Sequence, residues 1–420
     1  MTLNSHAFGN TLIAGAGPAA FAAAVQAAKG GYSNKLGLAN RAGEHSEQLQ
    51  KYFELNGFEV SSLFAPHLDQ SLNGKAAIYY FYPSLGEVND LWETIILCTP
   101  SHIYIEVLKE INIKNLKRAK QVVLLSPGIG SASMIVEQLA LDIEVISLSA
   151  YYAATKFSAE DPFSAFTKAL KKKVYVGSSH RNSSFAPVMA DFLRSTGPES
   201  EILSSAVEAE ARSITTYVHP PLFMNCVAMR EILREDKSLK SMYKLYPEGP
   251  ITQHAIKAMN ALWKEISEVV LCLGASPINL LEFLNDDNYP VHEYTLSRND
   301  ICEFPSFSSQ KQEYLLYIRY TAILIDPFSV PDENGTYFDF SKVPFAQVRR
   351  SRSGKWVLPR VPLEDYHKLK LVTELAFKAG IPMPVAHLLL RTFEEETAQF
   401  SETQREAFEN YDPEGKRETC

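Results

Sequence analysis

The stretch that decides the fold is Thr11-Leu12-Ile13-Ala14-Gly15-Ala16-Gly17-Pro18-Ala19-Ala20. An apolar run ends at Gly15 and an alanine-rich helical pattern begins at Pro18, which is the strand–turn–helix setting of a G-x-G-x-x-[G/A] motif. Gly15 permits a tight turn, Gly17 lets the backbone approach a pyrophosphate, and Ala20 keeps the helix close to the sheet. The alternative is a glycine that merely ends a strand. We expect a dinucleotide to bind this turn through the helix amino terminus, at Gly15, Gly17, Pro18 and Ala19.

Downstream of this turn, short β-branched apolar runs alternate with helical patterns, which is typical of a parallel sheet buried on both faces. The sequence therefore predicts an α/β fold with a Rossmann-like, doubly wound sheet, whose ligand lies at the carboxyl ends of the strands. The expected strands are 10–14, 35–39, 94–98, 121–125, 144–148 and 173–176. The expected helices between them are 19–29, 46–56, 102–111 and 133–141.

The end of the second expected strand indicates which dinucleotide binds. NAD enzymes usually carry an acid there, whereas an Arg accommodates a 2′-phosphate. Here the strand is followed by Asn40-Arg41, with no acid before Glu44. Because Arg41 can pair with a phosphate in a bidentate manner, the sequence favours NADPH, with a further hydrogen bond from Ser46 or His45. The alternative is that Arg41 is a solvated surface charge.

Two other strand ends are candidates for lining the cofactor. Cys98-Thr99-Pro100 and Ser126-Pro127-Gly128 each follow an expected strand. Backbone groups there, including those of Thr99 and Pro100, can face the ribose and nicotinamide, and ordinary turns are the alternative.

The pattern changes after about residue 205, where helical periodicity takes over. We therefore expect residues 1–205 to form the NADP(H)-binding domain and residues 206–420 a mainly helical substrate and dimerisation domain. A helix is predicted between Thr252 and Gly274, since apolar residues recur there at spacings of three and four. Further helices are expected at 312–324, 368–379 and 384–400, with a hairpin around Ser353-Gly354.

Composition excludes several classes of protein. The chain has 420 residues, too many for one compact core. Its net charge of −8 argues against nucleic acid as a partner, because neutralising phosphates needs a basic surface. Five scattered cysteines are typical of reduced thiols rather than of a disulfide framework or a zinc site. No apolar stretch has the roughly 20 residues that a membrane span needs, and residues 11–28 lack the positive leader of a signal peptide. We therefore expect a cytoplasmic protein with no membrane partner.

One candidate for acid–base chemistry lies in the second half. His219 is followed by Pro220 and Pro221, and a residue before proline is restricted towards extended backbone, so its ring can be aimed rigidly. Histidine is the natural proton carrier near neutral pH. A structural histidine is the alternative interpretation.

Four blocks of the second half resemble a known family. They are Tyr217-Val218-His219-Pro220-Pro221-Leu222-Phe223, Tyr243-Lys244-Leu245-Tyr246-Pro247-Glu248-Gly249-Pro250-Ile251-Thr252, Asn288-Tyr289-Pro290-Val291 and Asp326-Pro327-Phe328-Ser329. They resemble the opine dehydrogenases that make metallophores, namely the staphylopine, pseudopaline and yersinopine enzymes. The likeness runs from the glycine motif to about Leu390.

The resemblance implies a reductive condensation. The primary amine of a histidine-derived, nicotianamine-like intermediate would add to an α-keto acid, and NADPH would reduce the resulting imine to a secondary amine. His219 is then the expected general acid and base. The resemblance also implies a homodimer formed through the helical domain, and no metal in the enzyme itself. We favour pyruvate over 2-oxoglutarate as the keto acid.

Residues near these blocks are candidates for substrate binding, with ordinary packing as the alternative for each. The keto-acid carboxylate is expected to meet Arg212, Tyr217 and Asn225, since at helical spacing Arg212 and His219 would share a face. The amine substrate is expected to meet Tyr152, Tyr246, Tyr289 and His292. Asp326 is one candidate acidic partner of His219. Ala154 is a departure, because staphylopine-type enzymes carry an acid there.

Two other functions fit parts of the sequence. A different NADP-dependent oxidoreductase, similar to ketopantoate reductase or 6-phosphogluconate dehydrogenase, would turn over a simple hydroxy acid without any amine. A non-enzymatic NADPH-sensing protein would explain the glycine motif and Arg41. It would not explain the tyrosine-, histidine- and proline-rich blocks of the second half.

Overall fold

The chain forms two compact units, Met1–Arg212 and Ser213–Cys420. The computed structural model describes residues 6–140, 142–238, 240–287, 293–322, 333, 335, 339–351 and 353–412. The division falls after helix α6 (Ala206–Glu210), which packs on β8 (Glu144–Leu148) and β11 (Lys173–Ser178) of the first unit. The boundary expected between residues 205 and 206 therefore lies one short helix earlier than the division in the structure.

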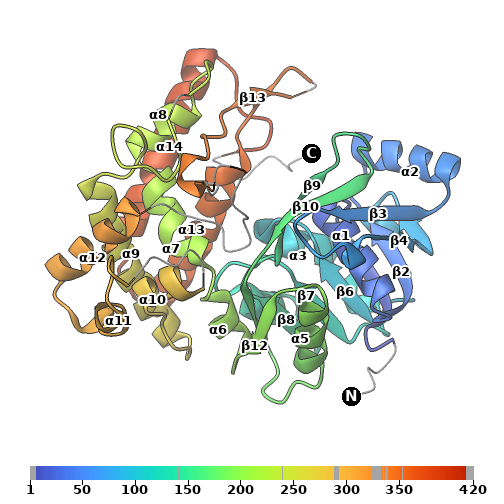
Figure 1. Cartoon of the computed structure of the whole chain (residues 1–420). Coiled ribbons are helices and arrows are strands. Elements are labelled where there is room, and N and C mark those ends of the chain that lie inside the picture. Colours follow the sequence, from blue (N-terminus) through green and yellow to red (C-terminus); the bar gives the residue numbers. More distant parts are fainter. Residues whose placement is uncertain are drawn as a thin grey trace. The chain divides into compact units, whose positions relative to one another are not determined.

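An eight-stranded sheet with the order β12-β11-β8-β7-β6-β1-β2-β5 forms the centre of the first unit (Figure 1). Its strands are β1 (Gly9–Ala14), β2 (Ser33–Ala39), β5 (Tyr80–Tyr82), β6 (Thr94–Leu97), β7 (Gln121–Leu124), β8 (Glu144–Leu148), β11 (Lys173–Ser178) and β12 (Glu199–Ile202). Six neighbouring strands of this sheet, β8, β7, β6, β1, β2 and β5, are parallel to one another, as expected. Strand β11 pairs with β8 in the antiparallel sense. Its expected position was right, but the expectation that it continues the parallel sheet was wrong.

The apolar runs are continuous because both faces of this sheet are buried. Leu12 packs with a cluster that includes Val107 of helix α3 (Tyr104–Glu110) and Ile135 of helix α4 (Ser131–Leu139). The next residue, Ile13, packs on the other face with Phe21 of helix α1 (Pro18–Lys29). This doubly wound arrangement confirms the predicted fold class. The helices of this unit are α1 (Pro18–Lys29), α2 (Glu44–Asn56), α3 (Tyr104–Glu110), α4 (Ser131–Leu139), α5 (Phe185–Ser195) and α6.

A second sheet of four strands, in the order β4-β3-β10-β9, packs on α1 and was not expected. Its strands are β3 (Glu59–Phe64), β4 (Gly74–Ala77), β9 (Ala153–Phe157) and β10 (Ser164–Leu170). Strand β9 alternates half-buried and exposed residues, so its sequence lacks a continuous apolar run. The exposed Ala154 lies on this edge strand.

Glu210 is a fully buried carboxylate that joins three elements of the first unit. It accepts hydrogen bonds from the backbone N–H groups of Gly130 and Ala132 at 2.7 and 2.9 Å, which caps α4, and from the Ser147 hydroxyl at 2.7 Å. Burial raises the pKa of Glu210 to about 7, although these donors oppose the shift.

The raised pKa predicts a pH-dependent stability. Below pH 4.5 the carboxyl is protonated in both states, and between about pH 4.5 and 7 the unfolded chain ionises first, so stability is lost as the pH rises. We expect the stability of the wild type relative to Glu210→Gln to fall by on the order of 3 kcal/mol from pH 4.5 to pH 8. Trp92 is the one tryptophan of the first unit. Its fluorescence during guanidinium unfolding, with Trp263 and Trp356 replaced by phenylalanine, measures this difference. An equal difference at both pH values would contradict the prediction.

The second unit is built from helices α7 (Ile214–Phe223), α8 (Cys226–Ile232), α9 (Gln253–Cys272), α10 (Leu280–Asp286), α11 (Arg298–Cys302), α12 (Ser309–Thr321), α13 (Arg360–Ala379) and α14 (Pro384–Gln404). Helices α9 and α13 both pack on α7 (Figure 1). Thr252 caps α9 as predicted, since its hydroxyl accepts from the Ala255 N–H at 3.1 Å. The predicted hairpin is also present, as β13 (Arg349–Arg350) and β14 (Trp356–Val357).

The backbone at His219 differs from the expectation. His219, Pro220 and Pro221 all lie inside α7, so the expected extended conformation was wrong. Pro220 and Pro221 are the seventh and eighth residues of this ten-residue helix, so α7 lacks the two hydrogen bonds that their N–H groups would donate. Packing of α7 against α9 and α13 therefore overrides the local preference.

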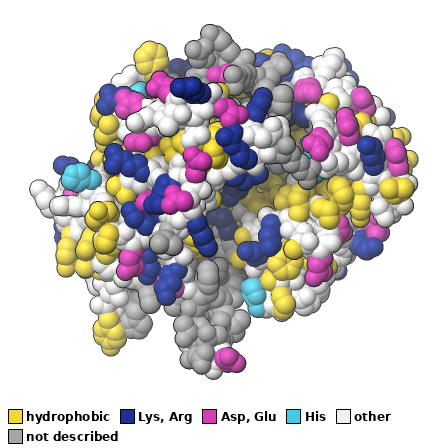
Figure 2. Space-filling view, turned by 90° about the horizontal axis from the view of Figure 1, so that it is seen from above, with side chains coloured by type: hydrophobic (Ala, Val, Ile, Leu, Met, Phe, Trp, Pro, Cys, Tyr) yellow, Lys and Arg dark blue, Asp and Glu magenta, His cyan; other side chains and the backbone are white. Residues whose placement is uncertain are grey.

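The surface carries charges of both signs. Figure 2 shows lysine and arginine side chains interspersed with acidic ones on the face that it draws, together with groups of hydrophobic side chains. Within the part of the chain that the structure describes, no helix is both long enough and apolar enough to cross a bilayer.

Candidate active site

The glycine turn of the first unit has the geometry that phosphate binding requires. Gly15 has φ +107°, and a Cβ there would lie 3.1 Å from the Cys98 carbonyl oxygen, so only glycine fits. Gly17 precedes α1 in an extended conformation, and nothing lies within 4 Å of the position that its Cβ would take. Pro18 occupies the first turn, and no side chain in the described part of the chain caps α1. The helix start is therefore open to a ligand.

A cavity of about 200 Å³ lies at this turn. Its lining joins the carboxyl ends of three neighbouring strands, and consists of Gly15, Ala16, Gly17, Asn40, Arg41, Leu85, Cys98, Thr99, Pro100, Ile103 and Val107. The Thr99 hydroxyl is buried and has no hydrogen-bond partner among the described residues. A buried hydroxyl without a partner costs free energy that a bound polar ligand would recover. The open helix start and this hydroxyl together fit a dinucleotide.

The loop that carries Arg41 is held by Ser46. The Ser46 hydroxyl donates to the Arg41 carbonyl oxygen at 2.5 Å and accepts from the Asn40 amide at 2.8 Å. Because this hydroxyl already donates its one proton to Arg41, Ser46 cannot donate to a phosphate as we expected. The Ser46 side chain is also buried. We therefore assign Ser46 a positioning role. His45 contacts the Ala16 carbonyl oxygen at 3.1 Å, which ties α2 to the glycine turn.

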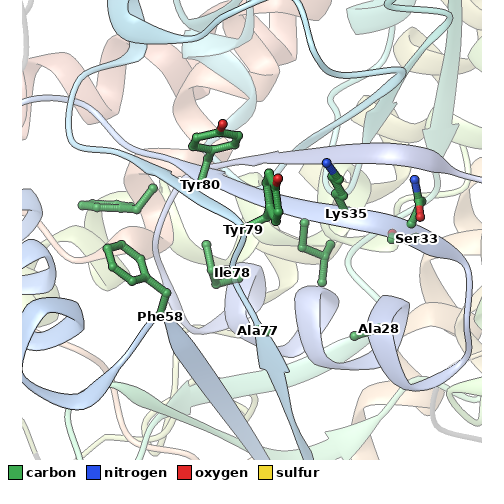
Figure 3. A pocket seen from close by; sticks show the side chains of 11 residues that line it. Ala28, Ser33, Lys35, Phe58, Ala77, Ile78, Tyr79 and Tyr80 are labelled. Atoms are coloured by element: carbon green, nitrogen blue, oxygen red, sulfur yellow. The ribbon is translucent and has the colours of Figure 1, made fainter.

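A second cavity of the first unit, of about 650 Å³, lies elsewhere (Figure 3). It is lined by the first residues of β2, including Lys35, and by Phe58, Tyr79 and Tyr80. The Lys35 ammonium lies 4.0 Å from the centre of the Tyr79 ring. Because ligands of open α/β sheets bind at the carboxyl ends of the strands, this cavity at the amino end of β2 does not suit the dinucleotide.

His219 has a carboxylate partner in the second unit. Its Nδ1 lies 3.1 Å from both oxygens of Asp365, which projects from α13. The Asp365 side chain is 5% exposed and that of His219 is 14% exposed. On the other side of the ring, the Tyr243 hydroxyl lies 3.3 Å from Nε2. A carboxylate on Nδ1 holds the imidazole in the tautomer whose Nε2 can accept a proton.

A second ion pair lies beside this histidine. The Glu364 carboxylate is 3.1 Å from the Lys368 ammonium, and both belong to α13. Burial opposes ionisation of Glu364, but the charges of Lys368, Arg360 and His219 hold its pKa below the ordinary value. Glu364 therefore places an ionised carboxylate in the electrostatic surroundings of His219.

Other expected site residues take different places. Arg212 precedes α7 and belongs to the first unit, where it bonds to the Glu208 carbonyl oxygen at 3.1 Å. The expectation that it shares a helical face with His219 was therefore wrong. Asn225 caps α8 by accepting from the Ala228 N–H at 3.0 Å, and its amide also donates to two backbone carbonyls. Its side chain is used within the fold.

The expected tyrosines divide into buried and exposed ones. Tyr217 and Tyr152 are 0% and 1% exposed, so both are core residues rather than open contacts for a substrate. Tyr246 is 60% exposed and lines a cavity of the second unit. Tyr289, His292 and Asp326 lie outside the residues that the structure describes.

Asp365, Tyr243 and the Glu364–Lys368 pair were missed as functional residues. Tyr243 lies in one of the blocks quoted above, but its spacing from His219 carries no signal. The helix expected to begin at residue 368 begins instead at Arg360, so Asp365 was left outside it.

We expect Asp365→Asn to lower kcat by about 10²–10⁴-fold, because an amide can donate to Nδ1 and impose the wrong tautomer. NADPH oxidation followed by absorbance measures this loss. The variant keeps the size of the side chain, and circular dichroism checks its fold. Glu374→Gln, an exposed change on the same helix, is the matched control. Full activity of the Asp365 variant would remove the carboxylate from the mechanism.

The family model described as staphylopine dehydrogenase matches residues 9–411. The chain belongs to this family. Its relatives are opine dehydrogenases, so the chain is a NAD(P)-dependent oxidoreductase of the opine dehydrogenase class.

Individual members of the staphylopine dehydrogenase family match nearly the whole chain. Pseudopaline synthase of Pseudomonas aeruginosa is 40% identical over 407 residues, which cover 96% of this chain and 93% of the relative. Staphylopine synthase of Staphylococcus aureus is 38% identical and covers 86% of this chain and 83% of the relative. A yersinopine dehydrogenase structure with NADP⁺ bound has a TM-score of 0.85 at 34% identity, covering 95% of this chain and 93% of that chain.

Proposed function

We propose that this chain is an NADPH-dependent opine dehydrogenase. It joins the primary amine of a histidine-derived, nicotianamine-like intermediate to an α-keto acid, with pyruvate preferred over 2-oxoglutarate, and forms an opine metallophore. The observation that carries the proposal is the pairing of His219 with Asp365 and Tyr243 in a member of the staphylopine dehydrogenase family.

The proton chemistry of such a condensation suits His219. The amine nitrogen bonds to the keto carbon, and the hydroxyl of the resulting carbinolamine must leave as water for the imine to form. Protonated His219 donates its Nε2 proton to that hydroxyl, and the carboxylate of Asp365 stabilises the imidazolium beforehand. Tyr243 lies on Nε2 and holds the ring when no substrate is bound.

The first unit supplies the cofactor-binding residues of this proposal. The glycine turn and the start of α1 would hold the pyrophosphate, and Arg41 the 2′-phosphate. Thr99 and Pro100 would line the nicotinamide side. When bound, NADPH supplies the hydride that reduces the imine. The yersinopine dehydrogenase structure with NADP⁺ supports this choice of cofactor.

The preference for pyruvate has support from two lysines of the second unit, one next to Tyr243 in the sequence and one on α13. A 2-oxoglutarate substrate brings a second carboxylate and so needs another cation. Lys368 and Lys244 already pair with Glu364 and Asp339, at 3.1 Å in each case. Pyruvate has a single carboxylate and therefore needs no second cation.

The experiment is NADPH oxidation by the purified chain with the histidine-derived aminobutyrate substrate, comparing pyruvate with 2-oxoglutarate and NADPH with NADH. We expect turnover that needs both the amine and the keto acid. Turnover of a keto acid alone would instead indicate a simple hydroxy-acid dehydrogenase. Cofactor binding without turnover of any pair would indicate a sensing protein. Sedimentation of the same sample tests the homodimer that we propose from the family.

A further inference from the structure

A cavity of about 680 Å³ lies in the second unit, beside the loop that follows Tyr243. It is walled by that loop, by the start of α9 and by α12. Three of its lining residues are unusually exposed aromatic side chains, namely Tyr246, Tyr314 and Tyr317, which are 60%, 62% and 42% exposed. Tyr314 and Tyr317 are three residues apart on α12, so they share one face of that helix. The cavity therefore presents aromatic rings to a ligand.

The same cavity contains a carboxylate without a partner. Glu313 lines it, is half-buried, and has no hydrogen-bond or ion-pair partner among the described residues. It lies four residues before Tyr317, so both project from one face of α12. A bound cation would give this carboxylate the charged partner that it lacks among the described residues.

Aromatic rings and a carboxylate together favour one class of ligand. The faces of tyrosine rings attract cations, and a carboxylate accepts charge-assisted hydrogen bonds from N–H groups. One ring already interacts with a cation, since the Lys240 ammonium lies 5.8 Å from the centre of Tyr246. That ammonium is engaged with Glu231 at 3.0 Å, so it does not neutralise Glu313. The combination suits an imidazole ring or an ammonium group.

The position of this cavity along the chain relates it to His219. Tyr243 contacts His219, and Tyr246 follows three residues later on the same loop. Even a fully extended chain separates these two Cα atoms by no more than about 11 Å. This span is comparable to the length of a small amine that bears several functional groups. The loop that contacts His219 through Tyr243 therefore also forms part of the cavity wall.

We infer that the cavity binds the nitrogen-containing cationic arm of the amine substrate, an imidazole or ammonium group, through Glu313 and the rings of Tyr246, Tyr314 and Tyr317. The reacting amine of the same molecule is then held at His219. This inference rests on the proposed function, because it places one part of that function's amine substrate.

Two measurements test the inference. Calorimetry of the full chain with histamine, in the absence of cofactor, measures binding directly. We expect Glu313→Gln and Tyr314→Ala each to lower the affinity for histamine at least about 10-fold, which corresponds to the loss of one charge-assisted contact. In steady-state assays, Glu313→Gln should raise the KM for the amine by a similar factor, with the KM values for keto acid and NADPH unchanged. Glu268→Gln, an exposed carboxylate on α9 outside the lining, is the matched control.

The outcomes separate the two proposals. Unchanged histamine affinity in both Glu313→Gln and Tyr314→Ala overturns the cavity assignment, whatever the enzyme turns over. Absence of turnover by the wild type contradicts the proposed function instead. Parallel titrations with imidazole and with n-propylamine assign the site to the ring or to the ammonium. Failure of all three probes to bind the wild type also overturns the assignment.

Discussion

His219→Gln is expected to lower kcat for the reductive condensation by about 10²–10⁴-fold, the contribution typical of a positioned general acid. The loss should appear in kcat more than in the KM values, because His219 acts when the carbinolamine hydroxyl leaves. Glutamine suits this test better than alanine. Its amide can still donate to Asp365, whereas alanine would leave that 5% exposed carboxylate without a partner.

Steady-state NADPH oxidation measures the loss, and the division of the effect between kcat and KM separates a catalytic role from a structural one. The KM values of the variant for amine, keto acid and NADPH should stay close to those of the wild type while kcat falls. Unfolding midpoints should be similar for both proteins. If the variant keeps the wild-type kcat, His219 is structural and the proposed mechanism is wrong.

Arg41→Ala is expected to lower kcat/KM for NADPH by about 10–100-fold and to leave kcat/KM for NADH within about threefold. The arginine follows β2 at the cavity of the glycine turn, where a 2′-phosphate would be the group that distinguishes the two cofactors. A charge-assisted, bidentate contact of about 1.5–3 kcal/mol accounts for a change of this size.

Direct titration of the protein with NADPH and with NADH gives the same comparison without turnover. Arg181→Ala, an exposed arginine of the first unit, is the matched control and should change neither affinity. The loss of NADPH affinity in Ser46→Ala should be larger than in the control and smaller than in Arg41→Ala, since Ser46 only holds the Arg41 loop. Equal losses for NADPH and NADH in Arg41→Ala would show that the arginine does not contact the 2′-phosphate.

Much of the first unit could be predicted because its signals are local. The expected strand positions are confirmed, since strands buried on both faces leave continuous apolar runs. The second sheet was missed because β9 is only partly buried and its pattern resembles a loop. In the second unit, Thr252 and the apolar spacing that follows it predicted α9, because capping and amphipathic periodicity operate within a few residues.

The active-site residues of the second unit illustrate the opposite case. The sequence singled out His219 but expected extended backbone there, because its prolines disfavour a helix. The structure places it in α7, since burial against α9 and α13 outweighs that local preference. Asn225 and Tyr217 were expected at the substrate because they neighbour His219. Neighbours in sequence point in different directions on a helix, so one caps α8 and the other is buried in the core.

The sequence by itself determined the strand–turn–helix at Gly15–Gly17, the parallel strands beside it and the arginine after β2. Each of these depends on backbone conformation and burial over a few consecutive residues. Only the tertiary structure decided that Asp365 pairs with His219, 146 residues away. That pair exists because α7 and α13 pack together, and no local pattern encodes which faces of two distant helices meet.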